Sequence, residues 1–363
     1  MGAFEIFFAS IVIDILPDEF VRNILVNVPH EGKDERSIVM TKRMFIIANT
    51  IHTYLDSGGF QLLLAEIYSK LINFDCKRPP CFTDKEVNIA PEHIIDVAMK
   101  MQPTIISALD FPIRTVTNEA EQEAEFMKKL GYNVLFTQRT AKLRKEICPE
   151  IQFFVPVQAY TVSQFEEFIW LIRDVEFDGL SIPIRNMEIP ELAIFLTSFY
   201  QKRISKVHIL GTSKFMETAL GAYMARHLFD WVSMDSTSWR ITAEHSIYLS
   251  PYDFSPVSVA YDVLIDENII MDCKCPWCQG KTFTYLKNLL YTNKVSFLRC
   301  HNHWVISNTA RELYENADTV SSLRHHLLSR TGKTEEVEEL CNCLTVVEAL
   351  KDGNIQALQN LLN

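Results

Sequence analysis

The amino-acid sequence predicts an α/β protein built on a (β/α)8 barrel, with an insertion late in the chain and a helical C-terminal tail. Short β-rich runs alternate with longer amphipathic runs over the first 240 residues, and such alternation is typical of a parallel sheet. Eight strands favour a closed barrel, and no G-x-G-x-x-G motif follows the first strand to support an open doubly wound sheet.

The predicted strands are short runs rich in β-branched and aromatic residues. Eight runs fit this description, and they are 4–10, 45–56, 104–110, 133–138, 151–158, 178–183, 206–211 and 231–236. The stretches between them place apolar residues at three- and four-residue spacing, as helices packed on a sheet do. The first strand lies in an apolar stretch that carries Glu5 and Asp14 and no basic n-region, so we expect a buried strand and no signal peptide.

The alternation ends near residue 250 and divides the chain into three predicted domains. Residues 1–258 are expected to form the barrel, and residues 259–318 a cysteine-containing subdomain with a closing helix. Residues 319–363 are expected to form the tail, whose Glu- and Leu-rich end from about residue 333 predicts two short helices.

Composition excludes several classes of protein. With 48% apolar and 22% charged residues, the 363-residue chain has enough apolar side chains to fold, which excludes an intrinsically disordered protein. The formal net charge of −11 excludes a surface that is basic throughout, so any nucleic acid must bind a local patch. No apolar run reaches the ~18 residues of a transmembrane helix, so we expect a cytoplasmic protein that does not bind membranes.

Most predicted strands close on a polar residue or a glycine. These residues are Asp56, Asp110, Gln138, Gln158, Ser181, Gly211 and Asp235. The C-terminal strand ends of a (β/α)8 barrel line its active-site mouth, so three carboxylates from three strands are expected to converge there. The alternative for each position is a residue that caps a helix or begins a turn.

Three cysteines in C-x-C-x-x-C spacing are followed, after 22 further residues, by a histidine. The four candidate metal ligands are Cys273, Cys275, Cys278 and His301. Three thiolates and one imidazole form a complete tetrahedral set for zinc, and a closed four-ligand site is structural, so we expect one structural Zn²⁺ per chain. His303 and Cys300 are alternative fourth ligands. Two other cysteine pairs, at 76 and 81 and at 341 and 343, lack further partners.

The segment that spans this cluster is basic and aromatic. It holds four lysines and one arginine but no Asp or Glu. Lys274, Lys281 and Lys287, together with Arg240 upstream, are therefore candidate contacts to a nucleic-acid backbone. A helix with one solvated face is the alternative.

The run Asp56-Ser57-Gly58-Gly59-Phe60-Gln61 resembles the D-S-G-G-F/Y-Q motif of the tRNA-guanine transglycosylase superfamily. The three cysteines and the histidine, with Asn302 after the histidine, are similar to the zinc motif of that family. Shorter matches occur, in order, at 108–110, 156–158, 177–179, 208–211 and 234–236. The resemblance covers about residues 45–315 and implies a (β/α)8 barrel with a zinc-binding insertion late in the chain.

The chain departs from tRNA-modifying members of this family at three places. The bacterial G-G-L-A-V-G-E loop is replaced at 181–186, the basic R-N-A-R-N-G motif is replaced at 239–242, and no archaeal-type RNA-binding domain fits in the tail. M-D-S-T-S-W at 234–239 and a slightly short Cys-to-His spacing resemble the DpdA branch. Members of that branch insert 7-deazaguanine derivatives into DNA, in bacterial modification islands and in phages.

The resemblance implies a pentosyltransferase (EC 2.4.2) that exchanges a base by double displacement. Asp235 matches the nucleophile that would form a covalent aspartyl-nucleotide intermediate, and Asp56 matches the general acid and base. Asp230 is a rival nucleophile, because F-D-W at 229–231 also resembles the family's F-D-S. We prefer Asp235, because it lies at the end of the last strand and Asp230 would begin it.

The same resemblance implies a pocket for a guanine-like base. Asp110 and Gln158 match the residues that hydrogen-bond the guanine edge, Phe60 would stack on the base, and Ser57 would help hold the pocket. Ser181 is a further candidate contact to the base. The target nucleotide would have to leave a duplex or be single-stranded.

Three functions remain open at the level of sequence. The first is a DNA-guanine transglycosylase that inserts 7-cyano-7-deazaguanine or a relative, in a bacterial cell or a phage-infected host. The second is a tRNA-guanine transglycosylase of the queuosine or archaeosine type. The third is an inactive zinc-containing partner subunit, against which the three aspartates argue. Expected partners are DNA, the 7-deazaguanine base, and a second copy of the chain or an accessory DNA-modification protein.

Overall fold

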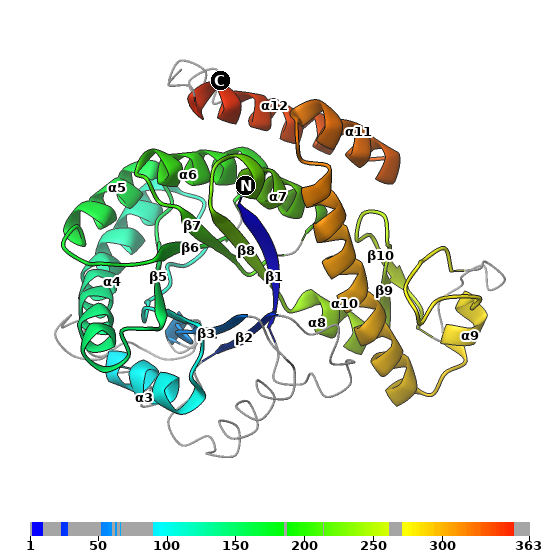
Figure 1. The fold of residues 1–363 in the computed structure, drawn as a ribbon, viewed down its shortest axis with the longest axis horizontal. Helices are drawn as coiled ribbons and strands as arrows, with labels where there is room; N and C mark the ends of the chain where they lie inside the picture. Colours follow the sequence, from blue (N-terminus) through cyan, green and yellow to red (C-terminus); the bar gives the residue numbers. More distant parts are fainter. Residues whose placement is uncertain are drawn as a thin grey trace. The chain divides into compact units, whose positions relative to one another are not determined.

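The computed structural model describes residues 2–9, 23–27, 52–59, 62–63, 66, 90–184, 187–212, 214–260 and 271–351. Eight parallel strands form a closed barrel in chain order, which confirms the predicted fold class (Figure 1). The strands are β1 Ala3–Ala9, β2 Asn23–Asn27, β3 His52–Asp56, β4 Ile105–Ser107, β5 Gln152–Pro156, β6 Gly179–Pro183, β7 Lys206–Leu210 and β8 Trp231–Ser236.

One predicted strand is wrong, and one observed strand was not predicted. Residues 133–138 belong to helix α4, Glu119–Ile147, so Gln138 ends no strand. The run has β-like composition, but Asn118 caps the helix by accepting from the backbone N–H groups of Ala120 and Glu121, and the helix continues through it. The missed strand is β2, whose five residues lie in a part of the sequence without a clear alternating pattern.

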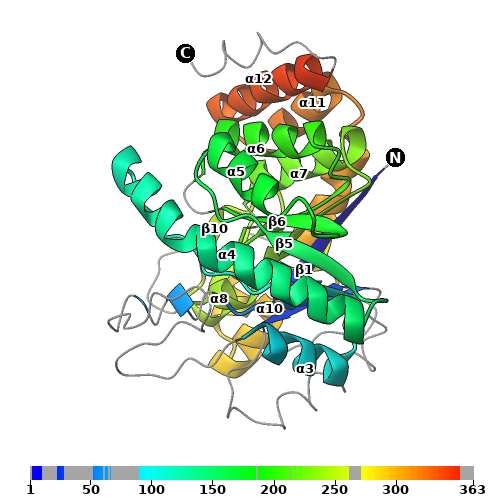
Figure 2. The same ribbon diagram turned by 90° about the vertical axis from the view of Figure 1, so that its left-hand side faces the viewer.

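The chain divides into two compact units. The first unit contains β2 to β7 with the helices α3 Pro91–Met101, α4 and α5 Val162–Leu171. Neighbouring strands of this unit pair in parallel, from β2 with β3 to β6 with β7. Helix α3 packs against α4, where Arg139 pairs with Glu92 at 2.6 Å (Figure 2).

The interior of the first unit is filled by large side chains that alternate along the strands. Tyr54 of β3 is fully buried, and its hydroxyl lies 2.7 Å from Ser181 Oγ on β6. The same tyrosine ring stacks on His208 of β7, with ring centroids 4.5 Å apart. Because side chains alternate along a strand, Asp56 lies on the same side of β3 as Tyr54.

The second unit contains β1, β8 and the C-terminal half of the chain. Strands β1 and β8 pair in parallel, with Phe7 opposite Asp235. The remaining elements are α6 Ile189–Gln201, α7 Phe215–His227, α8 Ser238–Glu244, β9 Ile247–Leu249, β10 Pro256–Ser258, α9 Phe283–Lys287, α10 Tyr291–Glu315, α11 Val320–Arg330 and α12 Thr334–Lys351.

The C-terminal helices of this unit cover its outer helices. Figures 1 and 2 both show α12 lying along α6 and α7, with α11 beside α12. Tyr223 of α7 donates a hydrogen bond to Glu348 of α12, and Arg324 of α11 pairs with Glu338 of α12. The predicted helical tail is confirmed, but residues 334–351 form one helix where two short helices were expected.

No helix in the described ranges is long and apolar enough to cross a membrane.

The domain boundaries at residues 258 and 318 stay predictions.

Candidate functional site

Asp110 stands in the loop after β4, and both of its carboxylate oxygens accept hydrogen bonds. Ser57 Oγ donates to Oδ1 at 2.5 Å, and Gln158 Nε2 donates to Oδ2 at 2.5 Å. All three side chains are buried. Ser57 follows β3 and Gln158 follows β5, so the structure brings together three predicted pocket residues from three strand ends.

Gly59 lets the backbone after β3 approach this carboxylate. A Cβ atom at Gly59 would lie 2.2 Å from Asp110 Oδ1 and 2.5 Å from the Asp110 carbonyl oxygen. The Gly59 N–H also donates to Ser57 Oγ at 3.0 Å, which leaves the Ser57 hydroxyl hydrogen for Asp110. A glycine is therefore required here by close approach.

We expect Gly59→Ala to displace Asp110 and to lower the base exchange that the family resemblance implies by at least about tenfold, the scale of one lost charge-assisted hydrogen bond. Kinetics with labelled guanine measure the loss, and Gly332→Ala is the control, since a Cβ there meets nothing within 4 Å. A Gly59→Ala protein with the unchanged rate would show that this close approach does not matter.

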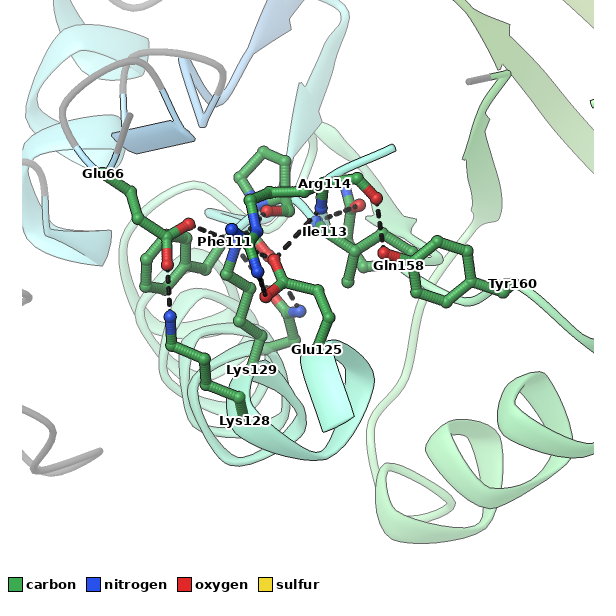
Figure 3. Close-up of polar contacts among 11 residues, drawn as sticks. Glu66, Phe111, Ile113, Arg114, Glu125, Lys128, Lys129, Gln158 and Tyr160 are labelled. Atoms are coloured by element: carbon green, nitrogen blue, oxygen red, sulfur yellow. Dashed lines mark hydrogen bonds and ion pairs between the residues drawn. The ribbon is translucent and has the colours of Figure 1, made fainter. Parts of the chain in front are cut away.

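The loop after Asp110 has no regular secondary structure, yet side chains hold its backbone (Figure 3). Asn133 accepts from the Phe111 N–H at 2.6 Å and donates to the Phe111 carbonyl oxygen at 3.1 Å. Lys129 donates to the Pro112 carbonyl oxygen at 2.7 Å, and the Ile113 N–H donates to Gln158 Oε1 at 3.1 Å.

The end of the same loop is held in a similar way. The Arg114 N–H donates to Glu125 Oε1 at 3.1 Å, and the Tyr160 hydroxyl donates to the Arg114 carbonyl oxygen. Glu125, Lys129 and Asn133 are spaced by four residues and form one buried polar stripe on α4. This stripe was not predicted from the sequence, although polar residues at four-residue spacing in a helix were a usable signal.

Asp235, the predicted nucleophile, is the fifth residue of the six-residue strand β8. It is 7% exposed, and its Oδ1 accepts a hydrogen bond from the Gly211 N–H at 2.5 Å. Gly211 follows β7 with a φ of 82°, a conformation that favours glycine. The predicted strand ends at Gly211 and Asp235 are thus brought together.

The rival Asp230 lies at the other end of β8. It precedes the first residue of that strand, is exposed, and accepts the Ala3 N–H through its backbone carbonyl oxygen. It lies five positions before Asp235, which corresponds to about 16 Å along an extended strand. C-terminal strand ends carry the active site of a parallel barrel, so this placement favours Asp235.

The remaining predicted pocket residues differ in placement. Asp56 is the last residue of β3 and is half-buried. Ser181 is fully buried in the middle of β6, where its hydroxyl meets Tyr54 instead of lying at the strand end. Phe60 lies outside the described residues.

The predicted metal ligands form one buried cluster, made of Cys273, Cys275, Cys278 and His301. Their ligand atoms lie within 4.8 Å of one another, and the sulfur atoms are 3.7, 3.4 and 3.3 Å from His301 Nδ1. Tetrahedral zinc with bonds of about 2.3 Å to sulfur and about 2.0 Å to nitrogen needs S···N edges of about 3.5 Å. The donor set and its spacing therefore fit a structural zinc ion.

Hydrogen bonds around the cluster favour the forms of His301 and Cys275 that bind a metal ion. His301 Nε2 donates to the Leu249 carbonyl oxygen at 2.9 Å, which leaves the lone pair on Nδ1. Hydrogen bonds from the Cys273 and Cys278 thiols lower the pKa of Cys275 below its usual range. A thiolate, the form that binds metal, is therefore favoured at Cys275.

Asn302, next to the histidine, also bonds to strand β9. Its Oδ1 accepts from the Leu249 N–H at 3.0 Å, and its Nδ2 donates to the Ile247 carbonyl oxygen and to Thr242 Oγ1. Consecutive residues of α10 thus hold both backbone groups of Leu249. The two alternative ligands, His303 and Cys300, are buried but lie outside the cluster, and the His303 ring packs on Phe8 at 3.7 Å.

The basic segment is less exposed than its composition predicts. Lys274 is exposed, and Lys287 is half-buried at the end of α9. Lys281 holds its ammonium group 4.8 Å from the centre of the Tyr285 ring. Lys294 is buried and donates to a backbone carbonyl oxygen, so it is no surface contact.

Two of the basic residues share one acidic partner from outside the segment. Glu244 of α8 pairs with Arg240 at 3.1 Å and with Arg299 at 2.6 Å. Burial raises the pKa of Glu244, but the two arginines outweigh it and the pKa is lowered. Counting charges within the segment missed Glu244, which lies 29 residues before Cys273 in the sequence.

A model of the family described as TGT, queuine tRNA-ribosyltransferase, matches residues 30–326. The match covers most of the chain and includes every proposed pocket residue and all four metal ligands. A search of curated proteins finds no match.

Proposed function

Because the chain belongs to the queuine tRNA-ribosyltransferase family of guanine transglycosylases, we propose that it replaces guanine in DNA by a 7-deazaguanine base. The exchange runs through a covalent intermediate on Asp235. The observation that carries the proposal is the buried Asp110 carboxylate. It accepts hydrogen bonds from Ser57 and Gln158, and the Gly59 backbone approaches it closely.

Asp110 is suited to read a guanine edge. A carboxylate accepts from both N1–H and the exocyclic amine of guanine, whereas adenine offers no hydrogen at N1. Two neighbouring donors hold the carboxylate in place before the base arrives, so little free energy is spent on ordering it. Gln158 shares the task, because its amide is itself fixed by the Ile113 N–H.

Asp235 is the proposed nucleophile. Its carboxylate attacks C1′ as the bond to N9 breaks, and the oxocarbenium-like charge is stabilised by the nearby negative charge. The Gly211 N–H holds Oδ1 at 2.5 Å, which orients the carboxylate. A second displacement by the incoming base restores the β configuration.

Asp56 is the proposed general acid and base. The departing guanine gains a proton and the incoming 7-deazaguanine loses one, so a single carboxyl group can serve both steps.

Zinc at the Cys3His cluster takes no part in these steps, because a closed four-ligand site leaves no position for substrate.

The proposal of DNA as the polymer rests on two departures from the tRNA enzymes and one resemblance to the DNA-modifying branch. Residues 239–242 replace the basic tRNA-reading motif, and residues 181–186 lack the acidic residue expected near an aminomethyl group. M-D-S-T-S-W at 234–239 resembles the DpdA branch. The second departure favours 7-cyano-7-deazaguanine as the incoming base. Lys274, Lys281 and Lys287 are proposed contacts to the backbone, with a smaller share for Arg240 because Glu244 pairs with it.

We expect purified enzyme and 7-cyano-7-deazaguanine to yield modified nucleoside in DNA and none in unmodified tRNA. Digestion and mass spectrometry measure both polymers in parallel, with heat-denatured DNA as a third sample, because a flipped or single-stranded target is required. Modified nucleoside found only in the tRNA digest would contradict the proposal. It would establish the second candidate, a tRNA-guanine transglycosylase, which the description of the matching family favours.

A further inference from the structure

Lys129 is a fully buried lysine with three partners from three different segments (Figure 3). Its ammonium group lies 2.6 Å from Glu66 Oε2, 2.5 Å from Glu125 Oε1 and 2.7 Å from the Pro112 carbonyl oxygen. An ammonium group has three hydrogens, so its donors are fully used. It also lies 4.5 Å from the centre of the Phe111 ring.

Two of these partners, Glu66 and Pro112, belong to the two segments that build the proposed base-reading site. Glu66 lies ten residues after Asp56, on the segment whose Ser57 and Gly59 touch the Asp110 carboxylate. Pro112 is two residues after Asp110. Lys129 therefore links the two segments at a second point, in addition to their contact through Asp110.

Burial disfavours the charged forms of Lys129 and Glu66, and their hydrogen bonds and ion pairs oppose this effect. Burial lowers the pKa of Lys129, against hydrogen bonds to Glu125 and Glu66 that raise it. Burial raises the pKa of Glu66, but hydrogen bonds from Lys128 and Lys129 outweigh it and the pKa is lowered. A buried charge is strongly disfavoured unless it is paired. Loss of the ammonium group would remove the buried partner of Glu66 and Glu125, which would then face the more exposed cations Lys128 and Arg114.

We infer that Lys129 is a positioning residue for base selection, which holds Asp110 in register with the segment that carries Ser57 and Gly59. This inference rests on the proposed function. Lys129 contacts no substrate and acts through the Pro112 carbonyl oxygen and Glu66. Without it, the Asp110 carboxylate can shift relative to the guanine amine that it accepts from.

The test compares guanine with hypoxanthine, which lacks the exocyclic amine. For Lys129→Met, we expect the ratio of kcat/KM for guanine to that for hypoxanthine to fall by about tenfold. A change of this size corresponds to the loss of one charge-assisted hydrogen bond. The fall should appear mainly in KM of the incoming base. A residue that only stabilised the fold would lower both rates together and leave the ratio unchanged.

Lys128→Met is the matched control. Lys128 is the adjacent residue of α4 and pairs with Glu66 Oε1, but it is partly exposed where Lys129 is fully buried. The control is expected to keep the wild-type ratio. A lowered ratio in both variants would assign the effect to the charge of Glu66 and overturn the role of Lys129.

A second variant keeps the inference testable if Lys129→Met does not fold. Glu66→Gln retains an oxygen acceptor for Lys129 but removes one charge, and a smaller fall in the ratio is expected. A folded Lys129→Met or Glu66→Gln protein with the wild-type ratio overturns the inference. Wild-type enzyme that exchanges no guanine in DNA or in tRNA contradicts the proposed function instead.

Discussion

Replacing Asp235 by Asn should abolish the covalent adduct with nucleic acid and lower base exchange by at least about a thousandfold. The amide has nearly the same shape and can still accept from the Gly211 N–H, so the fold is retained. It cannot attack C1′ or stabilise the positive charge of the transition state. Denaturing gels of enzyme mixed with an oligonucleotide and base measure the adduct.

Asp230→Asn is the control for this experiment. Asp230 is exposed and precedes β8, so its replacement should leave both adduct and exchange close to wild type. An adduct that persists in Asp235→Asn and disappears in Asp230→Asn would exchange the two assignments. The two variants carry the same chemical change five residues apart, so charge alone cannot account for a difference between them.

Replacing Cys275 by Ser should remove the zinc and unfold the region around β9, β10 and α10. Structural zinc contributes about 10–16 kcal/mol in small zinc domains, which exceeds or matches the ~5–15 kcal/mol stability of a whole domain. Elemental analysis is expected to give one zinc per wild-type chain and none in the variant. Thermal unfolding should begin at a markedly lower temperature.

Cys343→Ser is the matched control, because Cys343 is also buried but lies on α12 and outside the metal cluster. It should retain one zinc per chain and lose only the small free energy of packing one thiol. Wild-type protein without zinc, or a Cys275→Ser protein with its full metal content, would contradict the assignment. Chelation of the wild type should reproduce the Cys275→Ser result.

The fold class was predictable because strand–helix alternation is a local pattern. The two errors, at 133–138 and at β2, came from reading composition where no alternation was visible. The run from Asn133 to Gln138 looks like a strand, but a helix cap at Asn118 and the polar stripe facing the Asp110 loop decide otherwise. Because one strand was wrongly predicted and one was missed, the number of strands stayed at eight and the barrel prediction was still correct.

The positions of Asp56 and Asp235 near strand ends and the Cys3His cluster were predictable, because strand ends and cysteine spacing are visible in sequence. The side chains that hold these residues and their loops in place were not predictable, because their partners are distant in the sequence. Lys129 meets Glu66 from 63 residues away, and Leu249 is held by residues 52 and 53 positions later. The same distance hid Glu244, which neutralises part of the basic segment.

The most direct test of base exchange through Asp235 is to trap the adduct and locate it. Enzyme is incubated with a guanine-containing DNA oligonucleotide, denatured and digested, and the peptides are sequenced by mass spectrometry. The account predicts a nucleotide attached to the peptide from β8, at Asp235. Attachment at Asp230 or Asp56, or an adduct formed with tRNA and never with DNA, would contradict it.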